Sequence, residues 1–301
     1  MPSPSEISWL IPVLPLAGSC LIGILLVSFS LTMNRLSKPV SLLLTSCVGT
    51  AAVLSYTALA EQLKGADDVE ALLNLPGVEN INIQIGFGLD TIGAEMLSLI
   101  STTGVILMVS AHIYMNRKKG YAHFFTYLGF FIGALLGLVL SPNILELYIF
   151  WVLVGISSYL LTGFWYDPKG LSNTAKNVFL VDRIGDIGLL IGGLGLFWKT
   201  GSLGFDEIGS RLQEAISGGN LSNPTAILLC FFLVMGPIAK SIEFPLYIWR
   251  PDTLTTSIHV SAVIHAATVV AAGVFVIARL QPVFIAGTTV VTTTNLSNLI
   301  G

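Results

Sequence analysis

The sequence predicts an all-α integral membrane protein with about eight transmembrane helices, the seventh of which is discontinuous. Hydrophobic residues make up 53% of its 301 residues and charged residues only 10%, whereas a soluble domain carries about 25% charged residues. Apolar segments of about 20 residues, enough to cross a bilayer, recur along the chain. The net charge of −3 is small and argues against a nucleic-acid partner.

The expected transmembrane segments follow one another with mostly short loops. They lie at approximately residues 9–30, 40–60, 92–114, 121–140, 144–165, 178–198, 225–249 and 259–280. Two connections are longer. The first, residues 61–88, is acidic, and in the second, residues 200–224, the segment 205–216 has the pattern of a short amphipathic helix lying on the surface.

The basic residues predict the orientation of these segments. Loops after the even-numbered segments contain only Lys64, Lys199 and Arg211, and the other loops contain most of the basic residues. Because basic residues are enriched in cytoplasmic loops, we expect the N-terminus and both long loops on the outer, or lumenal, side. A cleaved signal peptide is not expected, because residues 1–7 lack a basic segment. The chain divides into N-terminal helices with the outer acidic loop (1–120), a five-helix unit (121–281) and a tail (282–301).

Lys240 lies inside the seventh segment, directly after a Gly236-Pro237 pair. An ammonium near the bilayer centre costs about 2.5–3.5 kcal/mol on insertion scales, and proline removes a helical hydrogen bond. We therefore expect a broken helix that faces protein or water, as in an ion path. Glu243, one turn later, would hold the lysine charged, or would form a second relay position if it points into another pocket.

The sixth segment carries three charged residues, Asp182, Arg183 and Asp186. Asp182 and Asp186 are four residues apart, and Arg183 and Asp186 are three apart. Each pair therefore shares one helix face. Two interpretations stay open: a structural ion pair near the end of the segment, or a charge that controls the protonation of Lys240. His265 in the eighth segment is a candidate for proton transfer because histidine titrates near neutral pH, although a lone histidine also packs commonly as a hydrogen-bonded core residue.

No sequence pattern indicates a cofactor. The three cysteines lie within apolar segments and fit no metal spacing, so we interpret them as small buried hydrophobic residues. No motif indicates a nucleotide, flavin, quinone or iron–sulfur site. We therefore expect a chain without redox chemistry of its own that binds no cofactor and is surrounded by lipid.

Motifs spread over nearly the whole chain carry a family resemblance. They lie at residues 9–15, 136–143, 158–166, 182–186, 236–241 with 244–246, and 261–268. They resemble the antiporter-like membrane subunit 5 of the complex I family, most closely its NAD(P)H-plastoquinone oxidoreductase branch. The resemblance implies packed transmembrane helices with a broken seventh helix, in which Lys240, His265, Arg183 and Asp186 match proton-path positions. It also implies other membrane subunits as partners, in a cyanobacterial thylakoid or plasma membrane or a chloroplast thylakoid.

Departures from the family pattern predict a changed function. Val152 stands where the resemblance implies a glutamate, Glu243 stands where it implies glutamine, and the chain stops at Gly301, before a second five-helix repeat and a lateral helix. We therefore expect a pumping-impaired structural or partner-binding paralogue in a larger energy-transducing complex. The alternatives are a working proton-translocating subunit of an NAD(P)H- or ferredoxin:plastoquinone oxidoreductase, or a membrane component of an ion or inorganic-carbon transporter.

Overall fold

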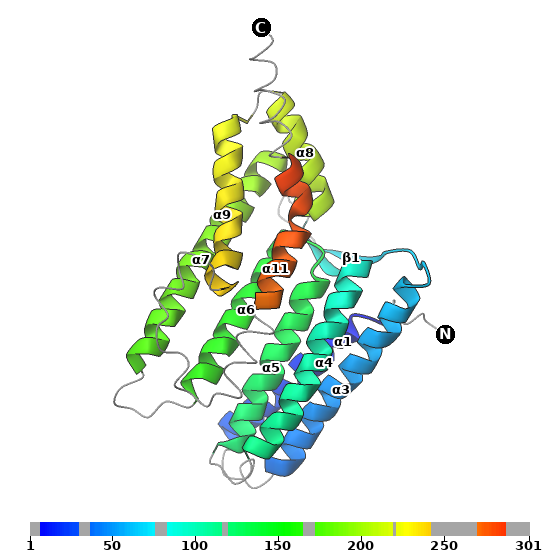
Figure 1. Cartoon of the computed structure of the whole chain (residues 1–301), viewed down its shortest axis with the longest axis vertical. Helices are drawn as coiled ribbons and strands as arrows, with labels where there is room; N and C mark the ends of the chain where they lie inside the picture. Colours follow the sequence, from blue (N-terminus) through cyan, green and yellow to red (C-terminus); the bar gives the residue numbers. More distant parts are fainter. Residues whose placement is uncertain are drawn as a thin grey trace.

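Long helices packed side by side form most of the protein (Figure 1). The computed structural model describes residues 7–29, 37–75, 83–115, 120–164, 172–218, 221–241 and 270–286. Its elements in chain order are α1 (Leu10–Ser28), α3 (Ser37–Gln62), β1 (Val69–Leu75), β2 (Ile83–Leu89), α4 (Thr91–Tyr114), α5 (Tyr121–Leu140), α6 (Ile144–Gly163), α7 (Ser172–Thr200), α8 (Phe205–Ser217), α9 (Asn223–Ser241) and α11 (Val270–Arg279).

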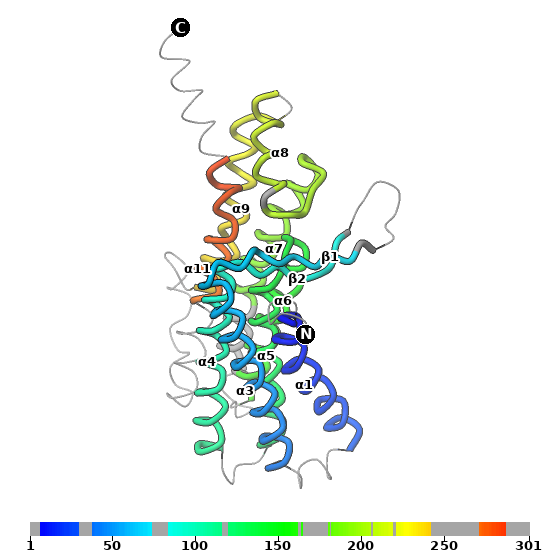
Figure 2. The backbone as a smooth tube through the Cα atoms, turned by 90° about the vertical axis from the view of Figure 1, so that its right-hand side faces the viewer, coloured from blue at the N-terminus to red at the C-terminus, as the bar shows by residue number. Residues whose placement is uncertain are grey.

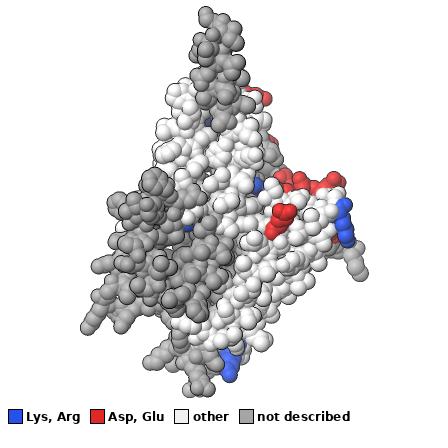
Figure 3. Space-filling model, viewed as in Figure 1, with Lys and Arg blue, Asp and Glu red and all other residues white. Residues whose placement is uncertain are grey.

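Six helices in the described part of the chain are long and apolar enough to cross a membrane: α1, α3, α4, α5, α6 and α9. This confirms the prediction of an all-α integral membrane protein. Helix α7 is longer, with 29 residues, but charged residues interrupt its apolar sequence. The predicted eighth segment is described only from residue 270 onward, so the expected total of eight stays a prediction. Figure 3 shows most of the visible acidic side chains beside the β1–β2 hairpin, and most of the helix surface without charge.

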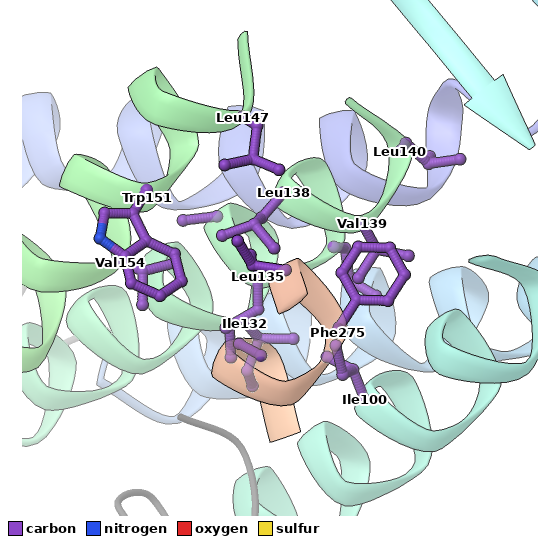
Figure 4. Close-up of a cluster of buried hydrophobic side chains, with 14 of the residues drawn as sticks. Ile100, Ile132, Leu135, Leu138, Val139, Leu140, Leu147, Trp151, Val154 and Phe275 are labelled. Carbon is purple, nitrogen blue, oxygen red and sulfur yellow. The ribbon is translucent and has the colours of Figure 1, made fainter. Parts of the chain in front are cut away.

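Helix α5 forms the centre of the bundle. It packs against α1, α3, α4 and α6, and its residues from 131 to 140 are all buried. A helix that is apolar on all sides is expected in such a position. Figure 4 shows Ile132, Leu135 and Leu138 of α5 in one cluster with Trp151 of α6 and Phe275 of α11. The core thereby joins the first helices to those that carry the charged residues.

The predicted acidic loop contains a β-hairpin. Strands β1 and β2 pair antiparallel, with Val69 opposite Leu89 and Leu75 opposite Ile83. Asn143, the N-cap of α6, donates from Nδ2 to the carbonyl of Gln84 at 2.7 Å, and the amide of Gly86 donates to Oε2 of Glu146 at 3.2 Å. These bonds hold the hairpin on the start of α6, where it runs across the helix axes (Figure 2).

The expected amphipathic helix is present as α8, which confirms that prediction. Its apolar stripe is buried: Phe205, Ile208, Leu212 and Ile216. The helix packs on α7, and a Cβ at Gly209 would lie 3.2 Å from the carbonyl oxygen of Pro282. The apolar face of α8 therefore lies against protein.

Helix α9 continues through Gly236 and Pro237 as far as Ser241. The interruption that we expected at this Gly-Pro pair is therefore not there. Proline is tolerated inside transmembrane helices where neighbouring groups satisfy the backbone, and here α7 covers this part of α9 closely. Residues 242–269 lie outside the described part of the chain.

Candidate functional site

Charged side chains from α7 and α9 meet beside α6 in the protein interior. Asp186 is 2% exposed and Lys240 is 3% exposed. Nη2 of Arg183 lies 2.8 Å from Oδ2 of Asp186, and Nζ of Lys240 lies 3.9 Å from Oδ1 of the same carboxylate. Asp182, 7% exposed, lies one turn earlier on α7. We call Asp182, Arg183, Asp186 and Lys240, together with Trp151, the charged cluster.

Trp151 of α6 completes the charged cluster. Its indole Nε1 donates to Oδ1 of Asp186 at 2.7 Å. Its backbone carbonyl accepts a hydrogen bond from Nζ of Lys240, and this ammonium also lies 4.1 Å from the centroid of the indole ring. A cation over an aromatic face is stabilised by the ring quadrupole, more strongly where water is excluded.

A row of glycines on α7 brings the two charged helices together. Its members, spaced by three or four residues, are Gly185, Gly188, Gly192 and Gly195. A Cβ at Gly188 would lie 2.9 Å from Cβ of Met235, and one at Gly192 would lie 2.8 Å from the backbone nitrogen of Leu233. Small residues permit this close approach of helices in membranes. The approach places Asp186 within reach of Lys240.

Gly155 leaves space on α6 for the ends of the Arg183 and Lys240 side chains. A Cβ there would collide with Nη2 of Arg183 and would lie 3.4 Å from Nζ of Lys240. A side chain larger than hydrogen would therefore displace the Arg183 guanidinium, while Lys240 would remain in ordinary van der Waals contact. Gly155 lies one turn after Trp151, so the same face of α6 supplies the indole and the free space.

The charges of the cluster balance. Two carboxylates, Asp182 and Asp186, face two cations, Arg183 and Lys240, when all four groups are ionised. Unpaired charges are expensive in a membrane interior, whereas pairing and hydrogen bonding reduce the cost. The arrangement can therefore keep an ammonium and a carboxylate close together at depth, and a small movement would let a proton pass between them.

The structure tests only part of the predicted site. Arg183 and Asp186 share a helix face and form the predicted ion pair, which lies in the middle of α7 rather than near its end. Lys240 is buried beside them. Glu243 and His265 lie outside the described residues, so their roles stay predictions.

Sequence reasoning missed Trp151 and Gly155 as parts of the site. Both lie in the α6 segment, close to Val152, the position where the family resemblance implies a glutamate. The pairing of an indole N–H with a carboxylate 35 residues later has no local sequence signal. The glycine spacing on α7 was visible in the sequence and could have predicted the helix contact.

A second polar region lies at the end of the bundle near the hairpin. A cavity of about 560 Å³ opens between the hairpin, α8 and α11, with Asp68, Asp90, Phe205 and Arg279 among its lining residues. Nη1 of Arg279 donates to Oδ2 of Asp90 at 2.6 Å, and Oδ1 of Asp90 accepts from the amide of Gly93 at the start of α4. The Arg279 guanidinium lies 5.6 Å from the Phe205 ring centroid. This ion pair ties α11 to α4.

Curated relatives match almost the whole chain. Subunit 5 of the NAD(P)H-quinone oxidoreductase of the Paulinella chromatophora chromatophore is 48% identical over 93% of this chain and 42% of its own length. Chain 5 of the Synechocystis sp. NAD(P)H-quinone oxidoreductase is 42% identical over 93% of this chain and 41% of its own length. The chain thus spans less than half the length of these relatives.

A solved structure has the same fold. The Mrp complex from Dietzia sp. contains a chain that superposes with a TM-score of 0.70 at 20% identity, covering 91% of this chain and 28% of that one. The transmembrane family described as NADH:quinone oxidoreductase/Mrp antiporter matches residues 141–300, which include the charged cluster. These matches confirm the resemblance seen in the sequence, and the chain belongs to the NADH:quinone oxidoreductase/Mrp antiporter family of transmembrane proteins.

Proposed function

We propose that the chain is a membrane subunit of a multi-subunit quinone oxidoreductase that moves protons, and that the charged cluster is its proton-exchange site. The observation that carries this proposal is the pair formed by Lys240 and Asp186, both almost fully buried, with Nζ and Oδ1 3.9 Å apart. Buried ionisable groups in membrane proteins are rare and mark ion paths by default. Redox chemistry belongs to other subunits.

The geometry favours proton exchange at this site more than the sequence does. Impaired pumping was expected in part because Val152 cannot ionise and because Glu243 would act as a local clamp for Lys240. In the described structure, Asp186 gives Lys240 a carboxylate neighbour on a different helix. A lysine can therefore exchange a proton locally without a glutamate at position 152.

A structural subunit without pumping is the second candidate function. It is favoured by the contacts of Trp151, which engage both Lys240 and Asp186 and keep them beyond direct hydrogen-bond distance. In that case the charged cluster would only fix the packing of α6, α7 and α9. Partner binding would then be the main role of the chain.

The relatives support a proposed setting for the chain. The cyanobacterial and chromatophore relatives are named as subunits of NAD(P)H-quinone oxidoreductases, which supports other membrane subunits and lipid as partners here. A cyanobacterial thylakoid or plasma membrane, or a chloroplast thylakoid, is the proposed location. The distribution of basic residues supports an N-terminus on the outer or lumenal side.

Proton movement in vesicles tests the proposal. The complete complex is reconstituted with a pH-sensitive dye inside, and quinone reduction is started. Lys240→Ala should strongly reduce the coupled pH change while the complex remains assembled, as checked by native electrophoresis. Lys199→Ala, at the exposed end of α7, is the control and should leave the pH change intact. An unaltered pH change in Lys240→Ala would leave only the structural role.

A further inference from the structure

Trp151 contacts both members of the Lys240–Asp186 pair. Its indole N–H occupies Oδ1 of Asp186, and this is the oxygen nearest to Lys240. Its carbonyl and the face of its ring hold the Lys240 ammonium. The side chain is fully buried, with 0% exposure. A single residue of α6 therefore fixes the acid and the base relative to each other.

These contacts keep the proton donor and the proton acceptor apart. The 3.9 Å between Nζ and Oδ1 exceeds the range of about 2.6–3.2 Å in which a proton passes directly. Nη2 of Arg183 lies 2.8 Å from the other carboxylate oxygen of Asp186 as its ion-pair partner. Hydrogen bonds to a carboxylate favour its ionised form. The indole N–H on Oδ1 thus occupies the position that a proton from Lys240 would take.

We propose that Trp151 is a positioning residue that controls proton exchange between Lys240 and Asp186; this inference rests on the proposed function of the charged cluster. The indole N–H first leaves Oδ1. An N–H bond of the Lys240 ammonium then breaks and an O–H bond forms on Oδ1, which leaves a neutral amine and a carboxylic acid. The indole returns to Oδ1 when the acid has lost its proton again.

Groups from three helices surround Asp186 in the described part of the chain. Tyr148 on α6 interacts electrostatically with Asp186 and Arg183. Helix α7 itself supplies Asp182 and Arg183, and α9 supplies Lys240. All of these groups remain when the indole is altered. A difference between indole variants therefore reports on the N–H contact.

Carbodiimide labelling of the intact complex in its own membranes tests this inference. Dicyclohexylcarbodiimide reacts with protonated buried carboxyl groups, and mass spectrometry of the peptide that contains Asp186 gives the labelled fraction at each pH. Trp151→Phe keeps an aromatic ring but removes the donor to Oδ1. The midpoint of labelling should move upward by about one to two pH units, the effect of losing a hydrogen bond to a charged acceptor. Trp198→Phe, at an 88% exposed position of α7, should leave it unchanged.

A second variant covers the case in which Trp151→Phe does not assemble. Incorporation of benzothienylalanine at position 151 keeps the shape of the indole and replaces its N–H by sulfur, and the same upward shift is expected. A midpoint equal to that of the control in these variants overturns the inference. Labelling does not require proton translocation. The vesicle assay of Lys240→Ala therefore tests the proposed function, and the labelling midpoint separately tests this inference.

Discussion

A methyl group at Gly192 should destabilise the protein by separating α7 from α9. A Cβ at this position would lie 2.8 Å from the backbone nitrogen of Leu233 and 3.0 Å from the carbonyl oxygen of Leu229. Ordinary van der Waals contacts begin at 3.4 Å. Helix α9 must therefore move away by at least about 0.6 Å, the difference between 2.8 and 3.4 Å. Because the opposing atoms belong to the backbone, no side-chain rotation can relieve the clash.

The expected loss follows from other cases of overpacking, which lower the free energy of unfolding by about 1–3 kcal/mol. Gly49→Ala in α3 is the matched control, because no atom lies within 4 Å of a Cβ at that position. Both substitutions add the same helix propensity, about 1 kcal/mol in soluble helices. The difference in stability between the two variants therefore isolates the packing contribution at Gly192.

Denaturation in mixed micelles measures this difference. The purified protein is titrated with sodium dodecyl sulfate, and the loss of helix is followed by circular dichroism. Gly192→Ala should unfold at a lower detergent fraction than Gly49→Ala, by an amount equivalent to about 1–3 kcal/mol. Equal stability of the two variants would refute the close contact between α7 and α9.

Two further predictions concern the end of the bundle near the hairpin. Asp90→Asn removes the charge that Arg279 contacts at 2.6 Å between side chains only 26% and 16% exposed. This substitution should lower the free energy of unfolding by about 1–3 kcal/mol in the same titration. Glu207→Gln is the control, because it breaks a longer and more exposed ion pair with Arg211. It should lower the free energy of unfolding by less than about 1 kcal/mol. Equal losses of stability in the two variants would contradict the role of Asp90. Asn143→Ala removes the cap of α6 and a hydrogen-bond donor to β2. It should lower the free energy of unfolding by about 1 kcal/mol and speed amide hydrogen exchange in β2. Unchanged exchange in β2 would contradict the anchoring of the hairpin by Asn143.

Most of the helices could be predicted because hydrophobic length alone decides which segments cross a bilayer. The amphipathic pattern of α8 was equally direct, since its apolar residues recur at helical spacing. The Arg183–Asp186 pair followed from its spacing of three residues on one helix. In each case, the information lies within a single helical segment.

Features that depend on contacts between distant segments could not be predicted. The hairpin lies on the start of α6, where Asn143 and Glu146 of that later helix hold β2 in place. Gly236-Pro237 indicated a break, but close contact with α7 keeps α9 helical there. The sequence left open that the charges of the sixth segment act on Lys240, and Asp186 lies beside it. Trp151, by contrast, reaches Lys240 only through tertiary packing.

A double-mutant cycle on proton translocation tests most directly whether Lys240 and Asp186 act as one unit. Lys240→Ala, Asp186→Asn and the double variant are compared in vesicles that contain equal amounts of assembled complex. Residues that act together give losses that do not add, so the double variant should lose no more activity than the more impaired single variant. Losses that multiply would mean that the two groups act independently and that the charged cluster is not one proton-exchange site.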